Sequence, residues 1–120
     1  MNQSVNGTIP IGAFGYCRGG YVHFGHYADA EGNKLENEIA MSIVAEDGEP
    51  EATATVRLEN PPKLGHVWLK GWSENAGLPE AMVEAGIVEL TGGVSCTGYV
   101  FADEGKLTPL AIAAIEAAKE

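Results

Sequence analysis

The clearest pattern of apolar and polar positions is a pair of alternating segments joined by a turn. In residues 39–44 the large apolar side chains occupy every second position, as in a strand with one buried face: Ile39, Met41 and Ile43. Residues 52–58 also alternate, with a polar face of Thr53, Thr55 and Arg57. The connecting EDGEPE contains Asp47-Gly48, a strong hairpin signal. We therefore predict an antiparallel hairpin whose polar face lies in water.

Further strands are predicted at 21–28, 66–72, 87–90 and 94–102 from their apolar, aromatic and β-branched content. Gly25 is a candidate bulge in the first of these strands. Clusters of Gly, Asp, Asn and Thr predict turns at 29–34, 91–93 and 103–106. The NPPK sequence at 60–63 should end the strand before it, because proline lacks an amide donor.

Helical spacing appears in two places. In 73–87, either Ser73 or Asn75 is suited to the N-cap, Pro79 to the first turn and Gly86 to a left-handed C-cap. The expected apolar stripe of this short helix is Leu78, Met82 and Val83, with Ile87 folding back on its last turn. A C-terminal helix is predicted over 108–119, where Thr108 is the N-cap and Pro109 the first residue.

These elements predict an α+β protein: an antiparallel sheet of about four to six strands with one short internal helix and one C-terminal helix. The length of 120 residues and the 45% hydrophobic content suit a single domain over 1–120. Gly7, Pro10 and Gly12 predict that residues 1–15 are largely irregular.

Charge limits the classes of partner. The chain carries 17 acidic and 7 basic residues, a net charge of −10. Residues 29–51 hold eight acids against Lys34 alone: Asp29, Glu31, Glu36, Glu38, Glu46, Asp47, Glu49 and Glu51. Such a surface repels phosphate backbones and anionic membranes, so we expect no direct binding of nucleic acid or membrane. It attracts basic proteins, although acidic residues also serve solubility alone.

The expected location is the cytoplasm. The N-terminal MNQSVNGTIPIG lacks the basic and long apolar regions of a secretory signal, and no apolar run is long enough to cross a bilayer. Cys17 and Cys96 are then expected to be reduced thiols.

Candidate chemistry is sparse. His23, His26, His66 and Cys17 could form a metal site, but positions 23 and 26 of a strand face opposite sides unless Gly25 is a bulge. We therefore expect strand histidines, no metal and no cofactor. Cys96 beside His66 is the remaining nucleophile–base pair to consider, and no G-x-S-x-G sequence is present. Neither feature indicates an enzyme, and we expect no catalysis.

Two tryptophans admit two interpretations. Trp68 and Trp72 are four positions apart, so on one strand they would share a face, with Lys70 between them. A wall of the core is favoured, because a domain of this size needs its large side chains inside. The alternative is an exposed binding patch, in which aromatic residues often anchor a partner.

The region from about Asn37 to Val100 resembles a family of small acidic proteins encoded among the accessory genes of bacterial plasmids and phages. The resemblance is carried by IAMSIVAEDGEPEATATVRLENPP (39–62), VWLKGWSENAGLPEAMVEAGIVELTG (67–92) and the closing GYV (98–100). It implies a mobile-element context and supplies no site residues.

Three functions remain in competition. The first is an interaction protein that modulates or inhibits a basic, nucleic-acid-handling host protein, in the manner of anti-restriction or anti-CRISPR proteins. Its expected interface is Glu36, Glu38, Glu46, Asp47, Glu49 and Glu51, with Trp68 and Trp72. The second is a homo-oligomeric accessory module, such as a homodimer. The third is a small-molecule-binding protein with a pocket formed by Trp68, Trp72, Tyr99 and His66.

Overall fold

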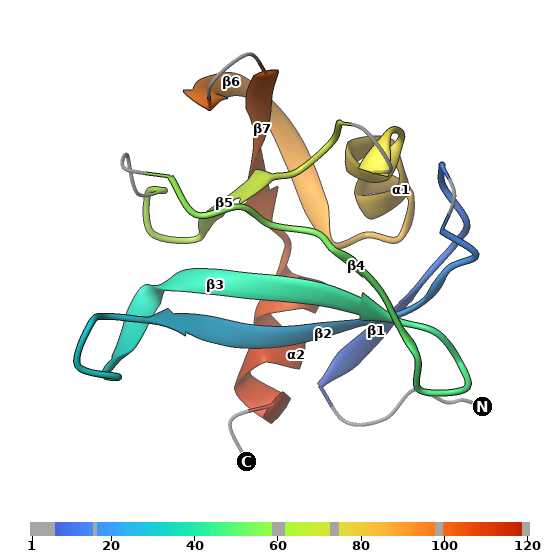
Figure 1. The fold of residues 1–120 in the computed structure, drawn as a ribbon, viewed down its shortest axis with the longest axis horizontal. Helices are drawn as coiled ribbons and strands as arrows, with labels where there is room; N and C mark the ends of the chain where they lie inside the picture. The colour runs from blue at the N-terminus through green and yellow to red at the C-terminus, as the bar shows by residue number, and fades with distance from the viewer. Residues whose placement is uncertain (1–6, 16, 59–61, 73–74, 98–99, 119–120) are drawn as a thin grey trace.

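The computed structural model describes residues 7–15, 17–58, 62–72, 75–97 and 100–118, without the side chains of residues 36, 37 and 97. Its strands form two antiparallel sheets (Figure 1). The first has the order β1-β2-β3-β4, with β1 (Thr8–Ile11), β2 (Gly20–Ala28), β3 (Lys34–Val44) and β4 (Pro50–Thr53). The second has the order β5-β7-β6, with β5 (His66–Leu69), β6 (Val88–Thr97) and β7 (Val100–Leu107). The helices are α1 (Leu78–Glu84) and α2 (Pro109–Ala118).

The segment after β4 joins the two sheets. The Ala54 amide donates to the Met41 carbonyl of the first sheet at 2.9 Å. The Val56 amide donates to the Trp68 carbonyl of the second sheet at 3.1 Å. Ala54 and Thr55 lie between the sheets and are buried, whereas Thr53 and Arg57 are exposed, as predicted. The prediction that Thr55 lies in water is therefore wrong: Thr55 is 2% exposed, and its hydroxyl accepts a hydrogen bond from the Met41 amide at 3.1 Å.

One buried cluster draws on both sheets and both helices. It includes Val22 and Ile43 from the first sheet, Leu69 from the second, Met82 from α1 and Ala111 from α2. α2 lies against β1 and β2, whereas α1 lies beside β6 (Figure 1). The expected apolar face of β3 is confirmed, since Ile39, Met41 and Ile43 are all buried.

The α+β class with a C-terminal helix is confirmed. In the described residues, however, seven strands are divided between two sheets, where we predicted one sheet of about four to six strands. The expectation that residues 1–15 are irregular is wrong for Thr8–Ile11, which pairs with β2 as the outer strand β1. Pro10 is tolerated there because an outer strand has one edge that needs no amide donor.

Two predicted turns are strands. Residues 91–93 form a bulge inside β6, where the register steps from Leu90↔Gly105 to Val94↔Asp103. Residues 103–106 lie in β7, which pairs with β5 on one side and β6 on the other. Pairing on both edges satisfies the amides and carbonyls of this segment, and that outweighs its turn-like composition. Gly105 permits the close approach, because a Cβ there would lie 3.1 Å from the Val88 Cβ.

The ends of α1 agree with prediction only in part. Gly86 has the left-handed φ of 80° expected of a C-cap, and the Ile87 amide bonds back to the Met82 carbonyl at 3.0 Å. The N-cap is Gly77 rather than Asn75, while Ser73 lies outside the described residues. Val83 is exposed and does not join Leu78 and Met82 in the core.

Three smaller predictions have clear outcomes. Gly25 pairs regularly with Ala40, and the irregularity in β2 lies instead between His26 and Ala28. The Thr108 hydroxyl caps α2 by accepting from the Ala111 amide at 3.2 Å, as predicted. In the part of the chain that the structure describes, no helix is long and apolar enough to cross a membrane.

Candidate functional site

The β3–β4 turn carries three exposed acidic residues. It projects from one end of the first sheet as the green loop at the lower right of Figure 1. Glu46, Asp47 and Glu49 are all exposed. The turn is well defined, since the Ala45 amide donates to the Glu49 carbonyl at 2.8 Å and the Glu49 amide donates to Asp47 Oδ1 at 3.0 Å. We call these three carboxylates the acidic turn.

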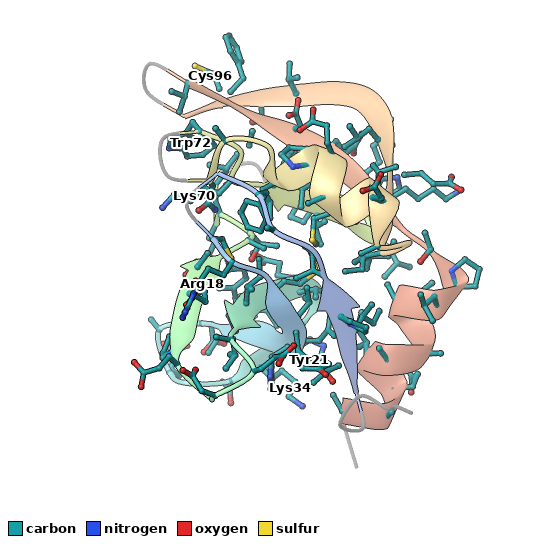
Figure 2. The ribbon with its side chains drawn as sticks, turned by 90° about the vertical axis from the view of Figure 1, so that its right-hand side faces the viewer. Arg18, Tyr21, Lys34, Lys70, Trp72 and Cys96 are labelled. Atoms are coloured by element: carbon teal, nitrogen blue, oxygen red, sulfur yellow. The ribbon has the colours of Figure 1, made fainter. Side chains whose placement is uncertain are left out.

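Glu51 differs from the acidic turn because it is paired. Its carboxylate lies 3.2 Å from Arg18 Nη2, and only 14% of its side chain is exposed. The hydrogen bond and charge of Glu51, with a smaller contribution from Asp47, raise the pKa of the already basic Arg18. Arg18 lies on the face shown in Figure 2. It offsets one charge of the hairpin and leaves the acidic turn strongly negative.

Glu38 is also not a freely presented anion. Its Oε1 lies 3.3 Å from Arg57 Nε, and 18% of the side chain is exposed. Arg57 donates in addition to the Ala28 carbonyl at 3.3 Å and lies 5.9 Å from the centre of the Tyr27 ring. Glu36 belongs to β3, but its side chain lies outside the described ones. Among the predicted acidic residues whose side chains are described, the exposed ones are therefore those of the acidic turn.

The two tryptophans do not form a shared strand face. β5 ends at Leu69, so Trp72 lies beyond the strand, half-buried and on the same side of the molecule as Lys70 in Figure 2. Trp68 is buried at 7% exposure and lies opposite Glu104 in the β5–β7 register. Strand alternation directs it away from Val67 and Leu69, which belong to the main core cluster. Trp68 therefore offers little surface to a partner.

The small-molecule pocket predicted from Trp68, Trp72, Tyr99 and His66 is not assembled by the described residues. Trp68 is buried, Tyr99 lies outside the described residues, and His66 Nδ1 is 3.1 Å from the carbonyl of Leu64. A metal site has no better support within the described segments, which contain no group of three or more His, Cys, Asp or Glu side chains placed to bind an ion. Cys17 is buried, with its sulfur 3.4 Å from the Gly19 amide.

Sequence reasoning missed a groove between β1 and α1. It has a volume of about 610 Å³, and its apolar lining includes Ile11, Phe14 and Ala81. Glu80 and Glu84 of α1 also line it and are exposed. Their i, i+4 spacing on a predicted helix was visible in the sequence, but nothing there placed residues 10–14 alongside.

A second hollow lies beside the acidic turn. It has a volume of about 380 Å³, and its lining includes Arg18, Tyr21, Glu46 and Asp47. It shares Pro10 and Ile11 of β1 with the larger groove. The acidic turn and the two glutamates of α1 therefore border adjoining hollows.

Comparison with known proteins adds no relative. No family model matches the chain, and neither the curated proteins nor the solved structures contain a match. The resemblance to accessory proteins of plasmids and phages stays a prediction, as do the cytoplasmic location and the absence of catalysis.

Proposed function

We propose that this protein is a non-enzymatic interaction protein that binds a basic protein partner through the acidic turn. The observation that carries the proposal is the exposure of Glu46, Asp47 and Glu49 on a turn held by its own hydrogen bonds. Because the turn is ordered, little conformational entropy is lost when a partner binds it. The net charge of −10 favours an approach by lysine- and arginine-rich surfaces.

The partner that fits this chemistry is a nucleic-acid-handling protein. Such proteins carry clustered Lys and Arg side chains that otherwise contact phosphates. A protein that covers those side chains with carboxylates modulates or inhibits the partner by competing with nucleic acid. A mobile-element protein acting on a host restriction or CRISPR component is one form of this function.

The test uses two matched triple variants of the full chain. Glu46→Gln, Asp47→Asn and Glu49→Gln neutralise the acidic turn, and asparagine retains the side-chain oxygen that accepts from the Glu49 amide. Glu31→Gln, Glu89→Gln and Glu116→Gln remove the same number of charges at other exposed positions. The partner is captured from a host lysate at low salt, identified and purified, and its affinity for each variant is then measured.

The first triple should weaken binding by about tenfold or more at low ionic strength, because several surface pairs of up to about 1 kcal/mol each are lost. The second triple should have a much smaller effect. Binding should weaken as salt is raised, and duplex DNA or RNA should compete for the purified partner. A partner that binds both triples with the affinity of the unmodified protein would refute the proposed interface.

A further inference from the structure

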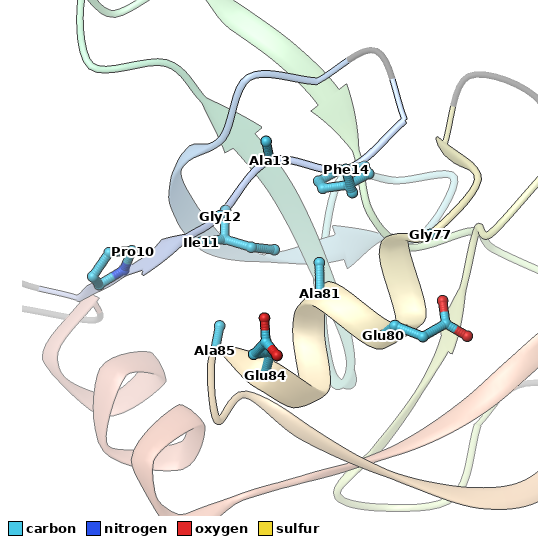
Figure 3. A pocket seen from close by; sticks show the side chains of 10 residues that line it. All are labelled: Pro10, Ile11, Gly12, Ala13, Phe14, Gly77, Glu80, Ala81, Glu84 and Ala85. Carbon is cyan, nitrogen blue, oxygen red and sulfur yellow. The ribbon is translucent and has the colours of Figure 1, made fainter.

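The groove between β1 and α1 combines an apolar floor with a negative rim. Figure 3 shows Ala81 and Ala85 on the side of α1 that faces Ile11 and Gly12, with the Glu84 carboxylate at the edge and Glu80 one turn earlier. Among the residues that line the groove, two are acidic and none is basic. The floor is therefore suited to apolar side chains and the rim to cations.

The charge of Glu84 is unfavourable in the protein alone, whereas Glu80 in the first turn is favourably placed for the helix dipole. Two glutamates at i, i+4 repel each other. Glu84 is also the last residue of the helix, where the helix dipole disfavours a negative charge, and no basic residue lies in the last turn. A partner that brings cations to Glu80 and Glu84 relieves both effects.

The dimensions of the groove indicate the conformation of its occupant. The α1 residues that line it run from Gly77 to Ala85, about 12 Å along the helix axis at 1.5 Å per residue. An extended segment of four residues covers about the same length. Glu80 and Glu84 are separated by about 6 Å along the axis, close to the roughly 7 Å between alternate side chains of an extended chain. β1, which contributes Pro10 and Ile11 to the lining, is moreover the outer strand of its sheet among the described strands.

We propose that this groove binds an extended segment of the basic partner in which basic and apolar residues alternate. The apolar side chains lie on the floor formed by Ile11, Phe14 and Ala81, and the basic side chains pair with Glu80 and Glu84. This inference rests on the proposed function, since it supplies the second contact region of the same partner, next to the acidic turn. A second copy of this chain is a poor occupant because each copy carries a charge of −10.

The test uses two fluorescently labelled peptides of equal composition and charge, Lys-Leu-Lys-Leu-Lys and Leu-Leu-Lys-Lys-Lys. Their binding to the full chain is followed by fluorescence anisotropy. Glu80→Gln with Glu84→Gln removes the charged rim. Gly12→Phe adds an aromatic ring at a residue that lines the groove, where a Cβ meets nothing within 4 Å and the φ is not positive. Gly25→Phe is the matched control on β2, because Gly25 is also exposed with nothing within 4 Å of its Cβ position.

The alternating peptide should bind the unmodified protein more tightly than the grouped one. The rim variant should weaken its binding roughly three- to tenfold at low salt. Gly12→Phe should abolish the preference, whereas Gly25→Phe should retain it. Circular dichroism and melting curves establish that each variant is folded.

Several results would overturn the inference: equal affinity for the two peptides, no binding of either, or a Gly12→Phe variant that keeps the preference. Self-association that Gly12→Phe removes would also overturn it, because a second copy would then fill the groove.

The variant with the neutralised acidic turn separates the two proposals. If that variant loses the partner while the peptide preference is missing from the unmodified protein, only the groove proposal fails. If the unmodified protein prefers the alternating peptide but neutralising the acidic turn leaves partner affinity unchanged, the acidic turn is not the interface and the proposed function fails there.

Discussion

Asn75 provides the sharpest test of how the two sheets are held together. It is 1% exposed, and its Nδ2 donates to the Thr53 carbonyl at 2.7 Å and to the Lys70 carbonyl at 2.9 Å. Thr53 ends β4 in the first sheet, and Lys70 follows β5 in the second. One amide group therefore joins the segments that leave the two sheets.

Asn75→Ala removes both hydrogen bonds, which are made by a side chain that is 1% exposed. At about 1–2 kcal/mol for each bond, the free energy of unfolding should fall by about 2–4 kcal/mol. For a chain of this length the melting temperature should fall by roughly 10 °C. The measurement is urea unfolding followed by circular dichroism, together with a melting curve. Ser42→Ala on the exposed face of β3 is the control and should change stability by less than about 0.5 kcal/mol.

Asn75→Asp tests the same reasoning through pH. A carboxyl placed there is buried and faces two carbonyl oxygens, so its folded-state pKa is raised above the unfolded value of about 3.9. The contribution of this protonated carboxyl to the stability of the Asn75→Asp variant is thus fully present below a pH of about 3.9. It is lost as the pH rises through the raised pKa. The free energy of unfolding of Asn75→Asp should consequently fall further below that of Asn75→Ala at pH 7 than at pH 4. An Asn75→Ala cost below about 0.5 kcal/mol, or a deficit independent of pH, would refute the proposed role of this amide.

Three further predictions concern local structure. Thr108→Ala should lower the free energy of unfolding by about 1–2 kcal/mol in urea melts, because the hydroxyl both caps α2 and lies 2.6 Å from the Gly86 carbonyl. Gly20→Ala should prevent normal folding, seen as lost native chemical-shift dispersion, since its Cβ would lie 2.2 Å from the Val44 carbonyl oxygen; Gly25→Ala should not. Asp29→Ala should reduce stability at pH 7, and the difference should shrink at pH 2, because hydrogen bonds from the Asn33 and Glu31 amides lower the Asp29 pKa.

The acidic turn illustrates local structure that the sequence predicted. Asp47-Gly48 predicted the turn, and the structure shows Gly48 at a φ of 92° with the Asp47 side chain bonded to the Glu49 amide. Sequence reasoning did not find that Glu38 and Glu51 are paired with Arg57 and Arg18. Those partners lie 19 and 33 residues away along the chain, and only the tertiary structure brings them together.

The sequence by itself determined the features that depend on a few neighbouring residues. The alternation in β3, the left-handed Gly86 after α1 and the Thr108 cap of α2 follow from side-chain and backbone chemistry within one or two turns of chain. The net negative charge and the α+β class follow from composition and periodicity in the same way.

Only the tertiary structure decided the conformation and burial of segments that pair with, or are covered by, distant parts of the chain. Residues 103–106 have the composition of a turn, but β5 and β6 supply partners on both edges and make them a strand. Thr55 is buried because the chain passes between two sheets there, and Asn75 bonds across those sheets instead of capping α1. The groove with Glu80 and Glu84 likewise exists only because residues 10–14 lie alongside α1. In each case the decisive energy comes from contacts between residues distant in sequence, which local patterns do not encode.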